Sequence, residues 1–180
     1  MGLFGNSLGK KPENKGGYSY ILEIARLITD NKSVLANLKT LLETPDSYFA
    51  DNAARYAERG MDVKTRSHKE LYWIALADEL SEGGCMFEVD WKCELEDFLW
   101  ALEQLNDYDL VKSAVLSLEL PEDGDVEVWG EELNAALDGK TFVCCIDIDS
   151  DSYPLMIVTA ETLERIQKLA ADNGQMIDVL

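Results

Sequence analysis

The C-terminal residues 141–180 limit the possible folds more than any other part of this 180-residue chain. Two β-rich runs, residues 142–148 and 153–158, are joined by the short polar segment 149–152, a pattern typical of a β-hairpin. A helix is then expected after the capping residue Thr159, and residues 176–179 are expected to form a further strand. The pattern predicts a C-terminal ββαβ unit.

The N-terminal part of the chain is mostly helical by the spacing of its apolar residues. Helices are predicted over residues 20–31, from a cap at Ser33, and from Pro45 onward. Ser67 and Glu70 have the spacing of a capping box, which opens a further helix. We therefore predict an α+β fold in which N-terminal helices pack on a mainly antiparallel sheet.

The middle of the chain adds a strand, two helices and one ambiguous segment. In residues 86–91, the apolar Phe87, Val89 and Trp91 alternate with Met86, Glu88 and Asp90, which predicts a strand with one buried face. Residues 94–105 and 126–137 have the apolar spacing of helices. The apolar residues of segment 111–120 fit both the two-residue period of a strand and the 3.6-residue period of a helix, and we favour a strand there.

The length and composition predict one domain, because roughly 150 residues form a typical domain and 47% of this chain is hydrophobic. Residues 1–17 contain five glycines and three lysines without a sustained apolar period. We expect a flexible leader over residues 1–17 and a single acidic α+β domain over residues 18–180.

The charge of the chain is large and uneven. The formal net charge is -19; residues 1–70 carry 11 basic and 9 acidic side chains, whereas residues 71–180 carry 5 basic and 26 acidic ones. Such a surface is repelled by nucleic-acid phosphates and anionic lipids, and it attracts a basic protein. We therefore expect a basic protein partner, no nucleic acid and no stable membrane association. Solubility alone is the alternative explanation of the charge.

The cysteines indicate neither a metal site nor a disulfide framework. Cys85, Cys93, Cys144 and Cys145 include no CxxC pair, and His68 is the single histidine. The adjacent Cys144 and Cys145 lie in a predicted strand, and we expect both to be buried. There is no secretory signal peptide and no run of 18 apolar residues, so we expect reduced thiols, a cytoplasmic location and no cofactor.

One acidic cluster has the composition of a cation site. Asp147 and Asp149 lie on the same face at the end of an apolar strand, with Asp151 close by. An EF-hand loop starting at Asp147 requires glycine and glutamate where the sequence has Ser152 and Val158. That motif therefore fails, and a metal-dependent enzyme using the three aspartates remains as an alternative function.

The motifs of other enzyme classes are missing from the sequence. It contains no GxSxG, HExxH, GxGxxG or P-loop, and His68 lies in the first turn of a predicted helix with no second histidine. We therefore predict no catalytic residues.

Aromatic residues beside carboxylates predict a partner-binding surface instead. Aromatic side chains supply buried area in an interface, while carboxylates pair with Lys or Arg of the partner. The predicted partner-binding residues are Glu88, Asp90, Trp91, Trp129, Asp147, Asp149, Asp151 and Tyr153. The competing interpretation is core packing, which the periodicity favours for Trp73, Trp91 and Trp100.

Three segments together resemble a bacterial domain family of unknown function: ELYWIALADEL, FEVDWKCELEDFLWALEQL and CCIDIDSDSYPLMIV. The similarity covers about residues 18–180 and is carried by the patterns W-K-x-x-x-E-D-F and I-D-x-x-S-D-S-Y. It implies no reaction, and it marks only recognisable positions, which are Asp90, Trp91, Asp149, Asp151 and Tyr153. The chain is also similar in type to small acidic immunity proteins of bacterial toxin systems, which neutralise a toxin by stoichiometric binding.

These observations lead us to expect a non-enzymatic protein-binding domain, namely an immunity protein that neutralises a basic bacterial toxin. The alternatives are the metal-dependent enzyme and a regulatory or scaffold module.

Overall fold

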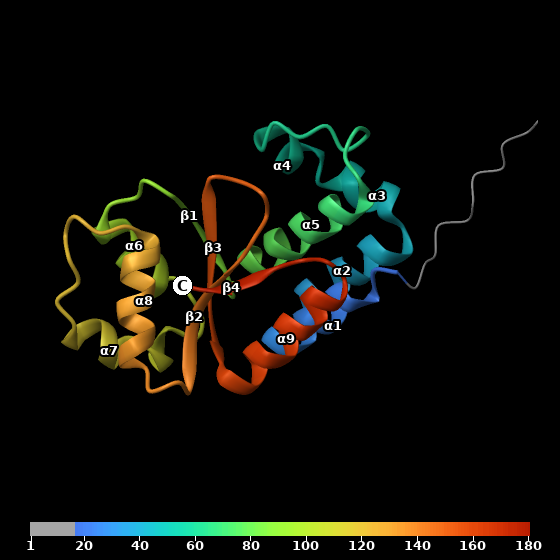
Figure 1. Cartoon of the computed structure of the whole chain (residues 1–180). Coiled ribbons are helices and arrows are strands. Elements are labelled where there is room, and N and C mark those ends of the chain that lie inside the picture. The colour runs from blue at the N-terminus through green and yellow to red at the C-terminus, as the bar shows by residue number, and fades with distance from the viewer. Residues whose placement is uncertain (1–16) are drawn as a thin grey trace, which may run out of the picture.

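A computed structural model of the chain describes residues 17–180 and shows a four-stranded sheet with helices on both of its faces (Figure 1). The strands are β1 (Phe87–Asp90), β2 (Thr141–Ile146), β3 (Ser152–Thr159) and β4 (Ile177–Val179). Their order is β1-β3-β2-β4, and each pair is antiparallel. The α+β fold and the C-terminal ββαβ unit are therefore confirmed. Residues 1–16 of the predicted leader lie outside the described residues.

The first helical layer covers one face of the sheet and comes from the N-terminal half of the chain and from the last helix. It contains α1 (Ser19–Ile28), α2 (Lys32–Glu43), α3 (Pro45–Asp51), α4 (Ala53–Glu58), α5 (His68–Glu82) and α9 (Ala160–Asp172). The capping box of Ser67 and Glu70 is confirmed at the start of α5. The expected cap at Ser33 is wrong by two residues, because the side chain of Asn31 accepts a hydrogen bond from the Ser33 backbone N–H.

The second helical layer covers the opposite face and comes from the middle of the chain. It contains α6 (Leu95–Glu103), a short 3-10 helix (Tyr108–Leu110), α7 (Lys112–Ser117) and α8 (Val126–Ala136). In residues 17–180, each helix is too short or too polar to cross a membrane.

The predicted strand over residues 111–120 is wrong, because Lys112–Ser117 within this segment form α7. Val111, Ala114 and Val115 face the core of the second layer at the i, i+3, i+4 spacing of a helix. Leu116 points to solvent. The sequence of this ten-residue segment is compatible with a strand and with a helix, and packing against the second layer favours the helix.

The sheet separates two apolar cores. Along β2, Cys144 and Ile146 contact the core of the first layer, whereas Val143 and Cys145 contact the core of the second. Successive side chains of a strand point to opposite faces, so the strand contributes to both cores. The expected burial of Cys144 and Cys145 is confirmed, each in a different core.

The expected core positions of the tryptophans are only partly correct. Trp73 and Trp129 are buried, but Trp91 is 49% exposed and Trp100 is 52% exposed. Trp91 comes after the last residue of β1, and Trp100 lies on the outer side of α6, away from the buried Phe98. Core packing is therefore wrong for Trp91 and Trp100.

Candidate functional site

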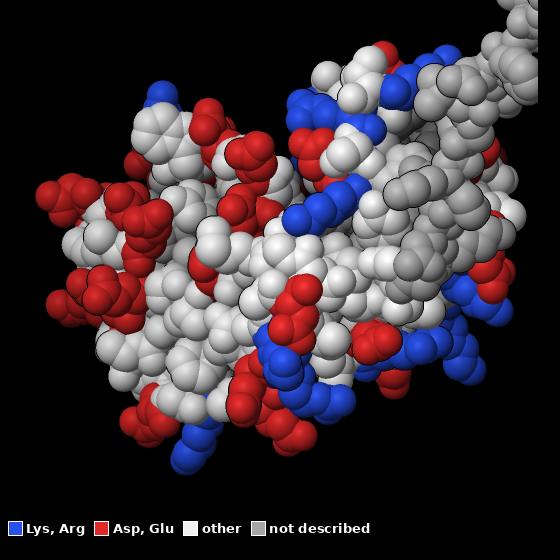
Figure 2. All heavy atoms as spheres, turned by 45° about the vertical axis from the view of Figure 1, so that its right-hand side comes forward, with Lys and Arg blue, Asp and Glu red and all other residues white. Residues whose placement is uncertain are grey.

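The second helical layer carries most of the negative charge of the protein. Residues 90–138 contain 15 acidic and 2 basic side chains, a net charge of -13. Except for the half-buried Asp107, all of these acidic residues are exposed. We call the exposed surface of residues 90–138 the acidic face, and carboxylates dominate the left side of the view in Figure 2.

A stripe on α6 combines an exposed indole ring with two carboxylates. Glu96, Trp100 and Glu103 are exposed, and their spacing of four and three residues places them along one side of the helix. The ring of Trp100 packs edge-on against Phe87 of β1, with ring centroids 5.1 Å apart. We call these three residues the Trp100 stripe. A half-exposed tryptophan between two carboxylates is suited to bind a basic partner.

The end of the β1–β3 pair brings four of the predicted partner-binding residues together. Trp91 follows Asp90, and its N–H donates a hydrogen bond to the carbonyl of Asp151 at 3.1 Å. The hydroxyl of Tyr153, two residues further along, donates to Glu127 Oε1 at 2.9 Å. Burial and then this carboxylate raise the pKa of Tyr153 to about 12. This end of the sheet therefore adjoins the N-terminal turn of α8 on the acidic face.

Asp147 and Asp149 lie in a different environment from those four residues. Both line a pocket of about 400 Å³ whose other walls include Arg66, Trp73 and Gln175. The N–H of Asp149 donates to Asp147 Oδ1 at 2.8 Å. In the part of the chain that the structure describes, no three His, Cys, Asp or Glu residues form a group suited to hold a metal ion.

Trp129 is not available to a partner. Its side chain is 1% exposed, and its Nε1 donates a 2.7 Å hydrogen bond to the carbonyl of Pro121. It packs on Phe98 in the core of the second layer. Its prediction as a surface residue was wrong because a local pattern of tryptophan beside glutamates does not show which side of α8 faces the core.

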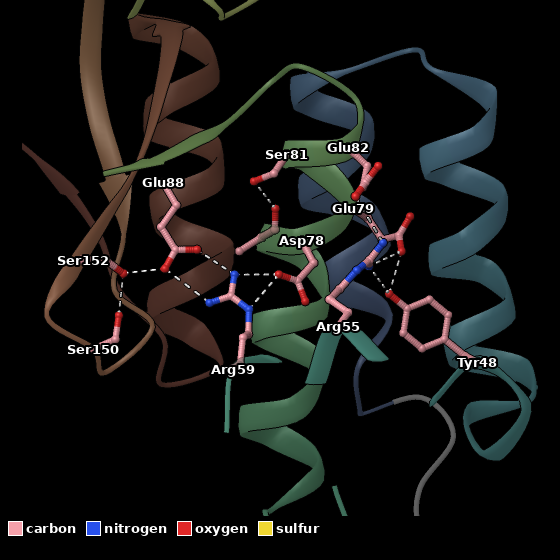
Figure 3. A network of polar contacts seen from close by, with 11 residues as sticks. Tyr48, Arg55, Arg59, Asp78, Glu79, Ser81, Glu82, Glu88, Ser150 and Ser152 are labelled. Atoms are coloured by element: carbon pink, nitrogen blue, oxygen red, sulfur yellow. Dashed lines mark hydrogen bonds and ion pairs between the residues drawn. The ribbon is translucent and has the colours of Figure 1, made fainter. Parts of the chain in front are cut away.

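Glu88 is engaged inside the molecule, in the network of Figure 3. Its Oε1 and Oε2 accept hydrogen bonds from Arg59 Nη1 at 3.2 Å and Nη2 at 2.6 Å, and Ser152 Oγ also donates to it. Nη2 of Arg59 also donates to Asp78 Oδ1 at 2.7 Å. Burial raises the pKa of Glu88, but the hydrogen bonds from Arg59 and Ser152 outweigh it and leave the pKa lowered. Glu88 therefore joins β1 to the first layer.

A second buried carboxylate, Glu79, forms the other half of that network (Figure 3). It is 1% exposed, and it accepts hydrogen bonds from the Tyr48 hydroxyl at 2.6 Å, Arg55 Nη1 at 3.0 Å and Asn37 Nδ2 at 2.7 Å. Three donors compensate the cost of burying this charge.

Sequence reasoning did not identify Asp78 and Glu79, although the sequence contains a signal for them. Residues 71–80 are apolar on every side of α5 apart from this pair, so the helix has no polar face on which the two carboxylates could reach solvent. An acidic pair inside such a helix must be buried and must be paired with cations or donors.

Comparison with curated proteins and with solved structures gave no match. A family model matches residues 21–180, which is nearly all of the described chain. The resemblance to a domain family of unknown function is thus confirmed, while that family carries no assigned reaction or partner. The chain belongs to the family described as domain of unknown function DUF6630.

Proposed function

We propose that this protein is a non-enzymatic protein-binding domain whose acidic face binds a basic protein. The observation that carries the proposal is the Trp100 stripe, because Trp100 is half exposed between two exposed glutamates. Tryptophan is enriched among the residues that supply most of the energy of protein interfaces. The exposed carboxylates beside it favour a partner that presents Lys or Arg.

The charge of the acidic face supports a role in the encounter with that partner. A net charge of -13 in residues 90–138 attracts a cationic surface over a distance of about 10 Å at 0.1 M salt. Electrostatic attraction of this kind increases the association rate more than the final affinity.

The specific form that we propose is an immunity protein that neutralises a basic bacterial toxin in the cytoplasm. Such a role requires fast, stoichiometric binding and no chemistry by the inhibitor itself. The acidic face with the Trp100 stripe fits the first requirement, since it combines long-range attraction with an aromatic anchor.

The alternative of a metal-dependent enzyme has less support from the geometry. It needs Asp147, Asp149 and Asp151 to converge, but only the first two line the pocket of about 400 Å³. The carbonyl of Asp151 instead accepts a hydrogen bond from the N–H of Trp91, at the other side of the loop.

The test is affinity capture from the source cells with three tagged baits. The first is the wild type, the second is the stripe variant Glu96→Lys/Trp100→Ala/Glu103→Lys, and the third is the control Asp51→Lys/Glu58→Lys. The control makes the same change in net charge at exposed positions of α3 and α4 in the first layer.

We expect a basic protein to be recovered in stoichiometric amount by the wild type and the control but not by the stripe variant. The purified pair must then re-form a complex whose association rate falls as salt is added. A partner that binds the stripe variant as well as the wild type would show that the acidic face is not the binding site. If the partner is a toxin, its activity must be lost at one equivalent of this protein.

A further inference from the structure

The outer edge of β1 is an unpaired strand edge beside the Trp100 stripe. β1 pairs with β3 on one side only, because it is the terminal strand of the sheet. Glu88 lies opposite Pro154, which has no N–H, so these two residues form a non-hydrogen-bonded pair. The backbone groups of Phe87 and Val89 therefore point toward β3, and those of Glu88 and Asp90 point outward.

Three of these four outward groups make no backbone hydrogen bond within residues 17–180. The N–H and carbonyl of Glu88 and the N–H of Asp90 make no backbone hydrogen bond in this part of the chain, whereas the carbonyl of Asp90 accepts one from Cys93. An edge of this kind is a template for an additional strand.

The charges along the edge select the type of strand that fits. An antiparallel second copy of β1 would bring the acidic residues of the two strands together, and like charges on facing strands are unfavourable. The carboxylate of Asp90 is exposed and accepts a hydrogen bond from the backbone N–H of Lys92 at 2.8 Å. A basic side chain opposite Asp90 is therefore favoured over an acidic one.

The opposite side of the same edge is apolar. Phe87 and Val89 point toward the second layer, where Phe87 contacts the exposed ring of Trp100. An added strand with alternating basic and apolar residues would place its apolar side chains beside Phe87 and Trp100, and a basic side chain beside the exposed Asp90, whereas Glu88 is already paired with Arg59.

We propose that the outer edge of β1 pairs with an extended basic segment of the partner and thereby adds a strand to the sheet. This inference rests on the proposed function and specifies how the acidic face recognises its partner. Main-chain hydrogen bonds to Glu88 and Asp90 fix the segment, and Trp100 contacts its apolar side chains.

The test uses the whole protein and the synthetic peptide acetyl-Lys-Val-Lys-Val-Lys-Val-amide. In the proposed register the lysine backbones bond to Glu88 and Asp90, and the valine N–H groups point away. One control peptide is N-methylated on its lysines, and a second is N-methylated on its valines, so the two have equal charge and equal numbers of methyl groups.

We expect the valine-methylated peptide to bind like the unmodified one and the lysine-methylated peptide to bind at least tenfold more weakly, by calorimetric titration. Amide hydrogen exchange at Glu88 and Asp90 must slow on binding. A protein variant, Asp90→Pro, removes one outward N–H and should weaken binding tenfold relative to Asp90→Ala, which removes only the carboxylate.

Equal binding of the two methylated peptides, or no binding of the unmodified peptide, would overturn strand addition. Either result leaves the proposed function to be decided by the capture experiment, because a partner that binds only through side chains of the acidic face still requires the Trp100 stripe. The peptide comparison also holds if Asp90→Pro does not fold.

Discussion

The ion pair between Arg59 and Glu88, 2.6 Å from Nη2 to Oε2, connects the end of α4 to β1 across 29 residues of sequence. The same guanidinium contacts the buried Asp78 on α5. One arginine therefore fixes the position of the strand whose outer edge adjoins the candidate binding surface.

Replacing Arg59 should destabilise the fold strongly. Arg59→Met leaves Asp78, whose side chain is 4% exposed, without the cation that forms its ion pair, and breaking a buried pair in this way costs about 3 kcal/mol. Urea unfolding monitored by circular dichroism measures the loss. The control Arg59→Met/Asp78→Leu should recover part of it, because the buried Asp78 carboxylate that lost its partner is then removed as well. A loss below about 1 kcal/mol for Arg59→Met would contradict this view of the network.

The two carboxylates that contact Arg59 should titrate on opposite sides of their ordinary values. Hydrogen bonds from Arg59 and Ser152 outweigh burial and lower the pKa of Glu88 below 4.5, whereas burial outweighs Arg59 and raises the pKa of Asp78 above 3.8. Carboxyl-carbon NMR titration of the folded protein checks both directions, and a Glu88 midpoint above 4.5 would contradict them.

The same shifts have a consequence for stability. The stabilisation from Glu88 is complete above pH 4.5 and is lost as the pH falls through its lowered folded pKa. The contribution of Asp78 has the opposite sign: it is most favourable below pH 3.8 and is lost as the pH rises through its raised folded pKa. The free energy of unfolding, measured with urea, should therefore fall more in the wild type than in Glu88→Gln as the pH decreases below 4.5.

Quenching of tryptophan fluorescence by cations and by anions should reveal the negative potential around the exposed tryptophans. Trp91 and Trp100 are about half exposed, whereas Trp73 and Trp129 are buried. At low salt, Cs⁺ should quench the fluorescence more than I⁻, because the acidic face attracts cations, and the difference should shrink as salt is added. The variant Trp91→Phe/Trp100→Phe should lose most of the quenchable signal. Stronger quenching by I⁻ in the wild type would mean that these rings do not lie in a negative potential.

The four thiols should differ in their reaction with iodoacetamide. Cys93 is half buried, whereas Cys85, Cys144 and Cys145 are buried. Burial raises the pKa of Cys145 to about 12 and also raises that of Cys144, so neither is a thiolate at pH 8. Mass spectrometry of the native protein should show labelling at Cys93 only, and Cys93→Ser should remain unlabelled until it is unfolded. Labelling of Cys144 before unfolding would show that the first core opens.

The sequence predicted those elements whose signals are local. The two β-rich runs 142–148 and 153–158, joined by a short polar segment, identified the hairpin, and the spacing of Ser67 and Glu70 identified the start of α5. Caps and β-rich runs depend on neighbours within a few residues, so they can be recognised without the fold.

The elements and residues that the sequence did not predict depend on distant contacts. The helix α7 was selected by packing on the second core, and the exposure of Trp100 depends on which side of α6 meets that core. Arg59 and Glu79 could not be assigned partners, because their contacts join α3, α4, α5 and β1 across long stretches of chain. Such relations follow from the topology and not from a local pattern.

The alternation of side chains along β2 and β3 also limits how the acidic face can work. Movement of the second layer away from the sheet would expose Val143, Cys145, Leu155 and Ile157 to water together, at roughly 1.5–3 kcal/mol for each large side chain. The acidic layer is therefore held as a rigid platform rather than a hinged lid. Under the proposed function, a partner would meet a surface that is already in its binding shape, and its capture would be governed by diffusion and orientation and not by a slow opening step.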